Sequence, residues 1–168
     1  MTNAPAQYRP AQIILHWVVV LGILVQWLFN GPIVSVIEAR QTGAELDGSA
    51  MTMAWFHVSV GSIILIAVIA RLYLRKRYGV PDHAPGTSDI QARIASGVHW
   101  SLYGLLLAMV LTGMLTWNGI APLGSAHFVI NTLIFFVALP TLLAQVNPLV
   151  GSLGASLIGF TTEHYEAV

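Results

Sequence analysis

Long stretches without a charged residue constrain this chain more than any other feature of its sequence. No Asp, Glu, Lys or Arg occurs in residues 10–37, 48–70 or 94–162. A transmembrane helix needs about 20 consecutive apolar residues, so each of the first two stretches can hold one and the third can hold two. Asn118-Gly119 and Pro122 interrupt the third stretch with residues typical of a turn.

The composition agrees with a chain built for a bilayer. Only 8% of the 168 residues are charged and 56% are hydrophobic, whereas soluble domains carry about 25% charged residues. We therefore predict an all-α fold: an integral membrane four-helix bundle with up-down-up-down topology, formed by residues 1–168 as a single membrane domain. The predicted spans are 13–29, 53–74, 94–116 and 126–146.

The two ends of the chain carry weaker signals. The first apolar segment has one basic residue before it and no small-residue cleavage site, which favours an uncleaved helix over a signal peptide. Within the tail 147–168, the apolar segment 149–160 is rich in Gly and Ser and only about a dozen residues long, too short to cross a membrane. We expect this tail to lie at the interface or to dock on another surface.

The basic residues indicate the orientation. Five of the seven lie at the connection between the second and third spans, and the connection between the first two spans has only Arg40. Cytoplasmic loops of membrane proteins are enriched in Lys and Arg. We expect this basic connection and both termini to face the cytoplasm, in a multi-pass protein of the bacterial inner (cytoplasmic) membrane. The five residues are Arg71, Arg75, Lys76, Arg77 and Arg93.

Charge balance and cysteine content exclude several classes of function. Seven basic and seven acidic residues give no net charge, so nucleic acid is not expected as a partner. The absence of cysteine excludes disulfides, iron–sulfur clusters, thiolate zinc sites and thiol redox chemistry.

Four histidines fall inside the predicted spans, at two depths. His16 and His99 lie near the end of the predicted spans that is joined to the basic connection, and His57 and His127 lie near the opposite end. Ionisable side chains at membrane depth usually have a partner or a task. Two neutral imidazoles on facing helices can take both axial positions of a haem iron. Gly61 lies one turn from His57, and Gly97 and Gly104 flank His99; these glycines would let a flat macrocycle approach the backbone.

Two other interpretations remain open at this point. Histidine and tryptophan near helix ends are also typical of an interfacial belt, and small residues serve ordinary helix packing. A zinc site would need three or four converging ligands, commonly including Cys, Asp or Glu, which the spans lack.

The sequence resembles the bacterial cytochrome b561 family, the four-helix di-haem membrane cytochromes related to the cytochrome b subunits of hydrogenases and formate dehydrogenases. The similarity is good from about Tyr8 to Leu115, thinner in the last span and lost after Asn147. The matching segments are Tyr8-Arg9, Leu15-His16-Trp17, the stretch from His57 to Arg75, Ala92-Arg93, Gly97-Val98-His99, Leu102-Tyr103 and Ala126-His127-Phe128.

The resemblance implies that His57 and His127 hold an outer haem b and that His16 is one ligand of an inner haem. The second inner ligand of the family falls at Thr141, which cannot replace an imidazole on iron. One haem is therefore expected at the outer site. At the inner site His99 supplies the missing ligand, or the iron has one axial ligand, or the site is empty.

The resemblance further implies that Arg71 neutralises a haem propionate or contacts a quinone, although Arg71 also fits a simple positive-inside anchor. The expected function is electron transfer between the quinone pool and a redox protein or larger membrane complex, as a cytochrome subunit more than as a stand-alone enzyme. Two alternatives are a haem-poor or haem-free accessory subunit and a quinone-linked oxidoreductase acting on superoxide.

Overall fold

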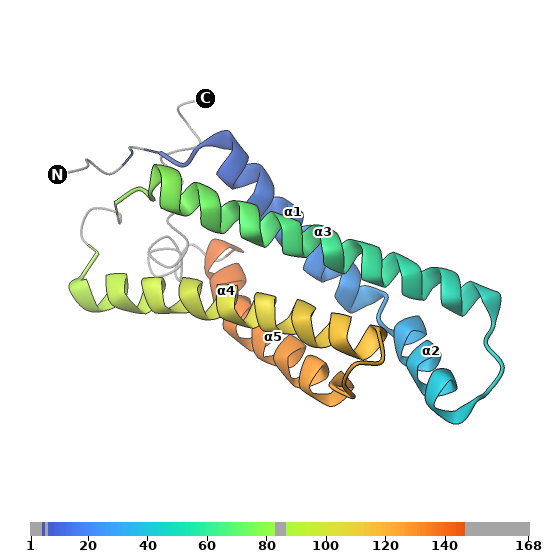
Figure 1. Ribbon diagram of the computed structural model, residues 1–168. Coiled ribbons are helices and arrows are strands. Elements are labelled where there is room, and N and C mark those ends of the chain that lie inside the picture. The colour runs from blue at the N-terminus through green and yellow to red at the C-terminus, as the bar shows by residue number, and fades with distance from the viewer. Residues whose placement is uncertain (1–4, 6, 83–86, 147–168) are drawn as a thin grey trace.

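The computed structural model describes residues 5, 7–82 and 87–146, with side chains up to residue 139. Within these ranges every regular element is a helix, as expected of an all-α fold. The predicted interfacial tail, 147–168, lies outside the described residues. The helices are α1 (Pro10–Leu28), α2 (Gly31–Thr42), α3 (Gly48–Tyr78), α4 (Asp89–Trp117) and α5 (Gly124–Val146), as labelled in Figure 1.

Local signals in the sequence explain where the helices begin and end. Pro10 occupies the first turn of α1, where its missing N–H is not needed. Ser88 caps α4 through two reciprocal hydrogen bonds. The backbone N–H of Gln91 donates to the Ser88 hydroxyl, and the backbone N–H of Ser88 donates to the side-chain oxygen of Gln91. Gly43 ends α2 and Gly79 ends α3, both with φ near +70°, a conformation that favours glycine.

The connection between the first two predicted spans holds a helix that the sequence analysis does not predict. Helix α2 occupies Gly31–Thr42, and α3 begins at Gly48, before the predicted start of the second span. Gly31-Pro32 favours a turn when taken by itself, but Pro is also common in the first turn of a helix. The structure therefore has five helices in its described part, one more than the four predicted.

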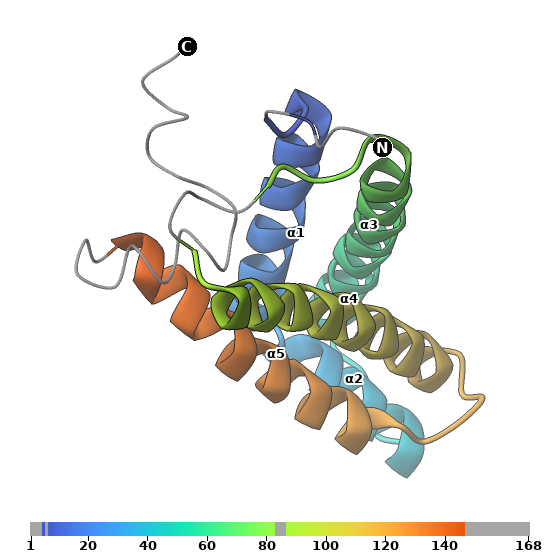
Figure 2. The same ribbon diagram turned by 90° about the vertical axis from the view of Figure 1, so that its left-hand side faces the viewer.

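The long helices pack as two hairpins. Helix α1 lies against α3, α4 lies against α5, and α4 joins the hairpins by packing on α3 (Figures 1 and 2). Gly22 permits the first contact, because a Cβ there would lie 2.8 Å from Cγ1 of Ile64. The buried core includes Val19 of α1, Val68 of α3 and Ile134 of α5.

Many large apolar side chains point away from this core. Ile66 is 68% exposed and Phe136 is 64% exposed, which a water-facing surface would not favour but a bilayer does. Helices α1, α3 and α4 are long and apolar enough to cross a membrane, and the apolar part of α5 with described side chains is shorter, Gly124–Leu139. The fold is thus a bundle of membrane helices.

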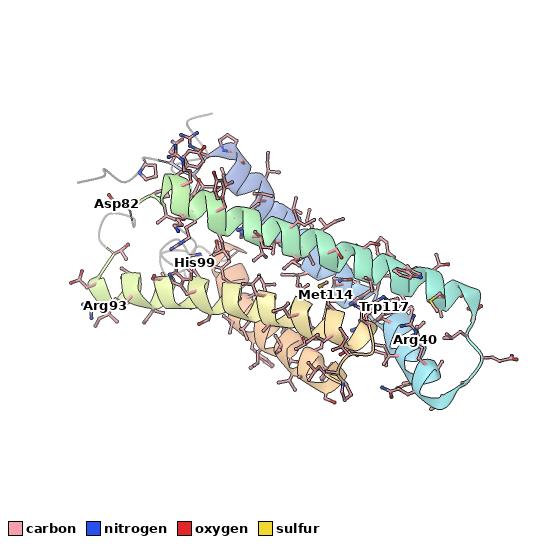
Figure 3. All side chains as sticks on the ribbon, viewed as in Figure 1. Arg40, Asp82, Arg93, His99, Met114 and Trp117 are labelled. Carbon is pink, nitrogen blue, oxygen red and sulfur yellow. The ribbon has the colours of Figure 1, made fainter. Side chains whose placement is uncertain are left out.

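The two ends of the bundle differ in charge. The start of α1, the end of α3 and the start of α4 lie together and carry six of the seven basic residues. Figure 3 shows Arg93, His99 and Asp82 towards this end, which we call the basic end, and Arg40 and Trp117 at the opposite end. Helix α2 and the turn between α4 and α5 form this second end, which we call the α2 end.

Candidate functional site

Two histidines from different hairpins face each other towards the α2 end. The ring centroids of His57 on α3 and His127 on α5 are 6.4 Å apart, with 59° between the ring planes. Both side chains are half-buried. Residues of an interfacial belt would be directed at lipid headgroups, so the approach of these two tilted rings towards each other favours a shared ligand.

Helix α4 fixes the orientation of the His127 ring. Nδ1 of His127 lies 2.8 Å from the carbonyl oxygen of Met109, with the Thr112 hydroxyl at 3.4 Å. A carbonyl oxygen can only accept, so Nδ1 carries the proton and Nε2 keeps the lone pair that binds a metal. Gly113 provides the space, because a Cβ there would lie 3.0 Å from Cε1 of His127.

His57 sits beside a polar residue of the first helix. The Gln26 amide donates to the backbone carbonyl oxygen of His57 at 2.9 Å, and a Cβ on Gly61 would lie 3.2 Å from the same amide nitrogen. Nδ1 of His57 is buried and has no hydrogen-bond partner in the described structure. Burying a nitrogen without a hydrogen-bond partner costs free energy. The unpaired Nδ1 is therefore expected at a ring that interacts with a group other than the protein.

The His57–His127 pair fits a haem with two axial imidazoles. Metal–imidazole bonds of about 2 Å place the centroids of two opposed rings roughly 6 Å apart, close to the observed separation. No group of three His, Cys, Asp or Glu side chains that could hold a metal ion occurs among the residues searched, those that the structure describes.

The other pair of histidines meets at the basic end. His16 of α1 and His99 of α4 line one cavity of about 30 Å³, enough for a water molecule. Arg71 lines the same cavity, so the structure brings these three predicted residues together. The sequence analysis did not place several other lining residues in a binding site; among them are Tyr8, Gln12, Arg75 and Tyr103.

Arg71 also has a structural contact. Its Nη1 donates to the backbone carbonyl oxygen of Gln12 at 2.8 Å, and the buried Gln12 side chain donates to the carbonyl oxygen of Gly79 at 3.2 Å. These bonds tie the start of α1 to the end of α3. Before α1, burial raises the pKa of the Tyr8 phenol above its ordinary value, with Arg75 opposing the shift, so the phenol stays protonated at neutral pH.

Three other residues singled out from the sequence are Thr141, Gly97 and Gly104. Thr141 lies within α5, but its side chain is outside those described. Among the described residues, no atom lies within 4 Å of a Cβ built on Gly97 or Gly104.

Comparison with known proteins identifies relatives among bacterial cytochromes. The family described as prokaryotic cytochrome b561 matches residues 7–153. A cytochrome b562 of Cereibacter sphaeroides is 29% identical over 119 residues, 71% of this chain and 71% of the relative. A probable superoxide oxidase CybB of Yersinia pestis is 30% identical over 108 residues, 64% of this chain and 56% of the relative.

A third relative, cytochrome b561 homolog 1 of Escherichia coli, is 25% identical over 108 residues, 64% of this chain and 57% of the relative. The chain thus spans little more than half the length of two of these three relatives. No solved structure matches the chain.

Proposed function

The chain belongs to the prokaryotic cytochrome b561 family, and from this membership we propose that it carries electrons between membrane quinone and a second redox protein or membrane complex. Membership makes it a bacterial multi-pass membrane protein that holds b-type haem and takes part in electron transfer. The family resemblance seen in the sequence is thereby confirmed. The haem ligands, the number of haems and the partners belong to the proposal.

The single observation that carries the proposal is the facing pair His57 and His127. We assign these two side chains as the residues that would hold one haem b, and that haem would supply one-electron transfer. The Met109 carbonyl keeps the proton on Nδ1 of His127, and Gly113 leaves room for its ring.

We assign the cavity at the basic end to the edge of a second group, an inner haem or a quinone. His16 and His99 supply imidazole there, and the Arg71 guanidinium compensates an anionic propionate or polarises a quinone carbonyl. Because the cavity has room only for water, side chains must move to admit either group.

The decisive experiment is a reduced-minus-oxidised visible spectrum of the purified protein together with its ratio of haem to chain. A sharp b-type band with at least one haem per chain supports the proposal. A chain without haem would be the accessory subunit considered above. Reduction by a quinol in the absence of any partner would identify a self-contained enzyme instead of a subunit.

A second candidate function is oxidation of superoxide coupled to quinone, favoured by the relative named as a probable superoxide oxidase. Two superoxide anions would yield two dioxygen molecules, and their two electrons with two protons would convert a quinone to a quinol. Quinone-dependent loss of superoxide by the purified protein would support this activity, and equal loss without quinone would exclude it.

The basic end is proposed to face the cytoplasm, with four spans in an inner membrane and both termini on that side. A fluorescent reporter fused after Lys76 should fold in the cytoplasm, whereas alkaline phosphatase fused within residues 119–124 should be active outside, because basic loops stay inside. Reporters that place both positions on one side would contradict the four-span topology.

The role of Arg71 can be separated from that of a simple anchor. Arg71→Leu should shift the midpoint potential of a nearby haem or slow quinone reduction, because a buried anionic group would lose its counter-charge. Arg71→Lys keeps the charge and should retain most of the potential. Arg77→Leu, at an exposed position of the same helix, is the control for basic charge.

If Arg71 acts only as an anchor, both leucine variants should lower membrane insertion and leave potential and turnover unchanged. Redox titration of the haem, followed by its visible absorption, distinguishes the two cases.

A further inference from the structure

A pocket of about 400 Å³ lies at the α2 end, where the proposed electron-transfer function makes no use of it. One wall comes from α2 and the other from the end of α4 and the following turn. Its volume is in the range of small-molecule sites. The lining residues used below are Ile37, Arg40, Gln41, Trp117, Asn118 and Pro122.

Arg40 is the one basic residue at this end of the bundle, since the other six lie at the basic end. Its Nη1 donates to the carbonyl oxygen of Trp117 at 3.1 Å, and its guanidinium carbon lies 4.1 Å from the centroid of the Trp117 ring. Figure 3 shows the two residues close together. These contacts hold the guanidinium in position at the pocket.

The positive charge of Arg40 is not neutralised by these contacts. A carbonyl oxygen and an indole face are neutral partners, and no carboxylate of the described chain forms an ion pair with Arg40. Glu38 is on the same helix, but residues two apart do not face each other. The pocket therefore presents a cation whose contacts among the described residues include no carboxylate and whose remaining N–H groups suit an anionic oxygen ligand.

The pocket lies where a membrane surface is expected. Trp117 ends the apolar helix α4, and tryptophan is enriched at the boundary between hydrocarbon and headgroups. The walls combine donors, Arg40 and Gln41, with apolar groups, Ile37 and Pro122. This combination matches a charged ester joined to a glycerol backbone.

We propose that this pocket binds the phosphodiester of an anionic phospholipid. The Arg40 guanidinium and the Gln41 amide donate to phosphate oxygens, and the glycerol lies against Trp117 and Ile37. The site depends neither on the number of haems nor on which side of the membrane the α2 end faces, because both leaflets present phosphate esters.

Retention of lipid by the purified protein tests the charge. After exchange into detergent with dioleoylphosphatidylglycerol, native mass spectrometry should show one tightly held lipid. Arg40→Gln should lower its occupancy about tenfold, as expected for loss of a charged hydrogen bond. Arg93→Gln, an exposed arginine at the basic end, is the matched control and should keep the lipid.

A second variant distinguishes loss of a lipid contact from a change in the protein's own packing. Arg40→Gln also removes the bond to Trp117, whereas Gln41→Leu leaves that bond intact and should still weaken lipid retention. Unchanged occupancy in both variants would overturn the proposal, as would an equal loss in Arg93→Gln.

Fluorescence tests the location and the source of the phosphate. Brominated phosphatidylglycerol should quench the wild-type protein more than brominated phosphatidylcholine does, and Trp117→Phe should abolish that difference. Glycerol phosphate and inorganic phosphate, at millimolar concentration, should not displace the lipid. Displacement by either soluble ion would overturn the lipid assignment in favour of a soluble phosphate ligand, and equal quenching by both lipids would overturn the site.

Discussion

Replacing His57 or His127 by alanine is expected to remove at least half of the low-spin haem signal, whereas His16→Ala removes less. The first two residues face each other across 6.4 Å and form the more complete ligand pair. Either substitution would leave one imidazole to hold the haem at this site, and two are needed for the low-spin signal. The inner pair depends on His99, because position 141 is threonine.

The reduced-minus-oxidised spectrum and the haem content of each variant measure this effect. His164→Ala, in the C-terminal tail, is the control and should leave both unchanged. If the wild-type protein holds two equal low-spin haems and His99→Ala destroys one, His99 is a ligand and the inner site is complete. Unchanged spectra in both the His57 and His127 variants would refute the assigned outer site.

Gly113→Val is expected to weaken haem retention about tenfold without touching a ligand. The Cβ alone would lie 3.0 Å from Cε1 and 3.1 Å from Nδ1 of His127, and the branched side chain adds further crowding. Overpacking of this kind costs about 1–3 kcal/mol. The imidazole must move and lose its bond to the Met109 carbonyl, so the haem dissociates faster.

Haem transfer to apomyoglobin measures the dissociation rate in this experiment. Gly48→Val, at the start of α3, is the matched control, since it puts the same residue in a helix where no described atom lies within 4 Å of the new Cβ. Gly113→Ala should give a smaller loss than valine. Equal rates for the two valine variants would show that Gly113 does not position His127.

Parts of the fold and of the candidate site were predictable from local sequence patterns. The uncharged stretches identified all four long helices, because burial of an apolar segment in lipid needs only length and composition. The short helix α2 was missed, since its Gly31-Pro32 start resembles a turn and it begins after the predicted end of the first span at residue 29. The two depths of the histidines also followed from their positions along the predicted spans.

The supporting residues of the candidate site had no comparable signal. Met109 acts through its backbone carbonyl and Gly113 through the absence of a side chain, and neither property marks a residue in the sequence. Gln26 and Gln12 are polar residues at membrane-helix positions, a signal that sequence reasoning could have used.

By itself, the sequence determined that this chain is helical, lies in a bilayer, has no thiol chemistry and carries imidazoles at two depths. These properties depend on the count and order of residues, which act through local hydrogen bonding and transfer into lipid. The tertiary structure decided that His57 faces His127, that α4 orients the His127 ring and that the Arg40 guanidinium lies over the Trp117 ring. Such contacts join residues far apart in the chain, so they depend on how the two hairpins pack and not on any local pattern.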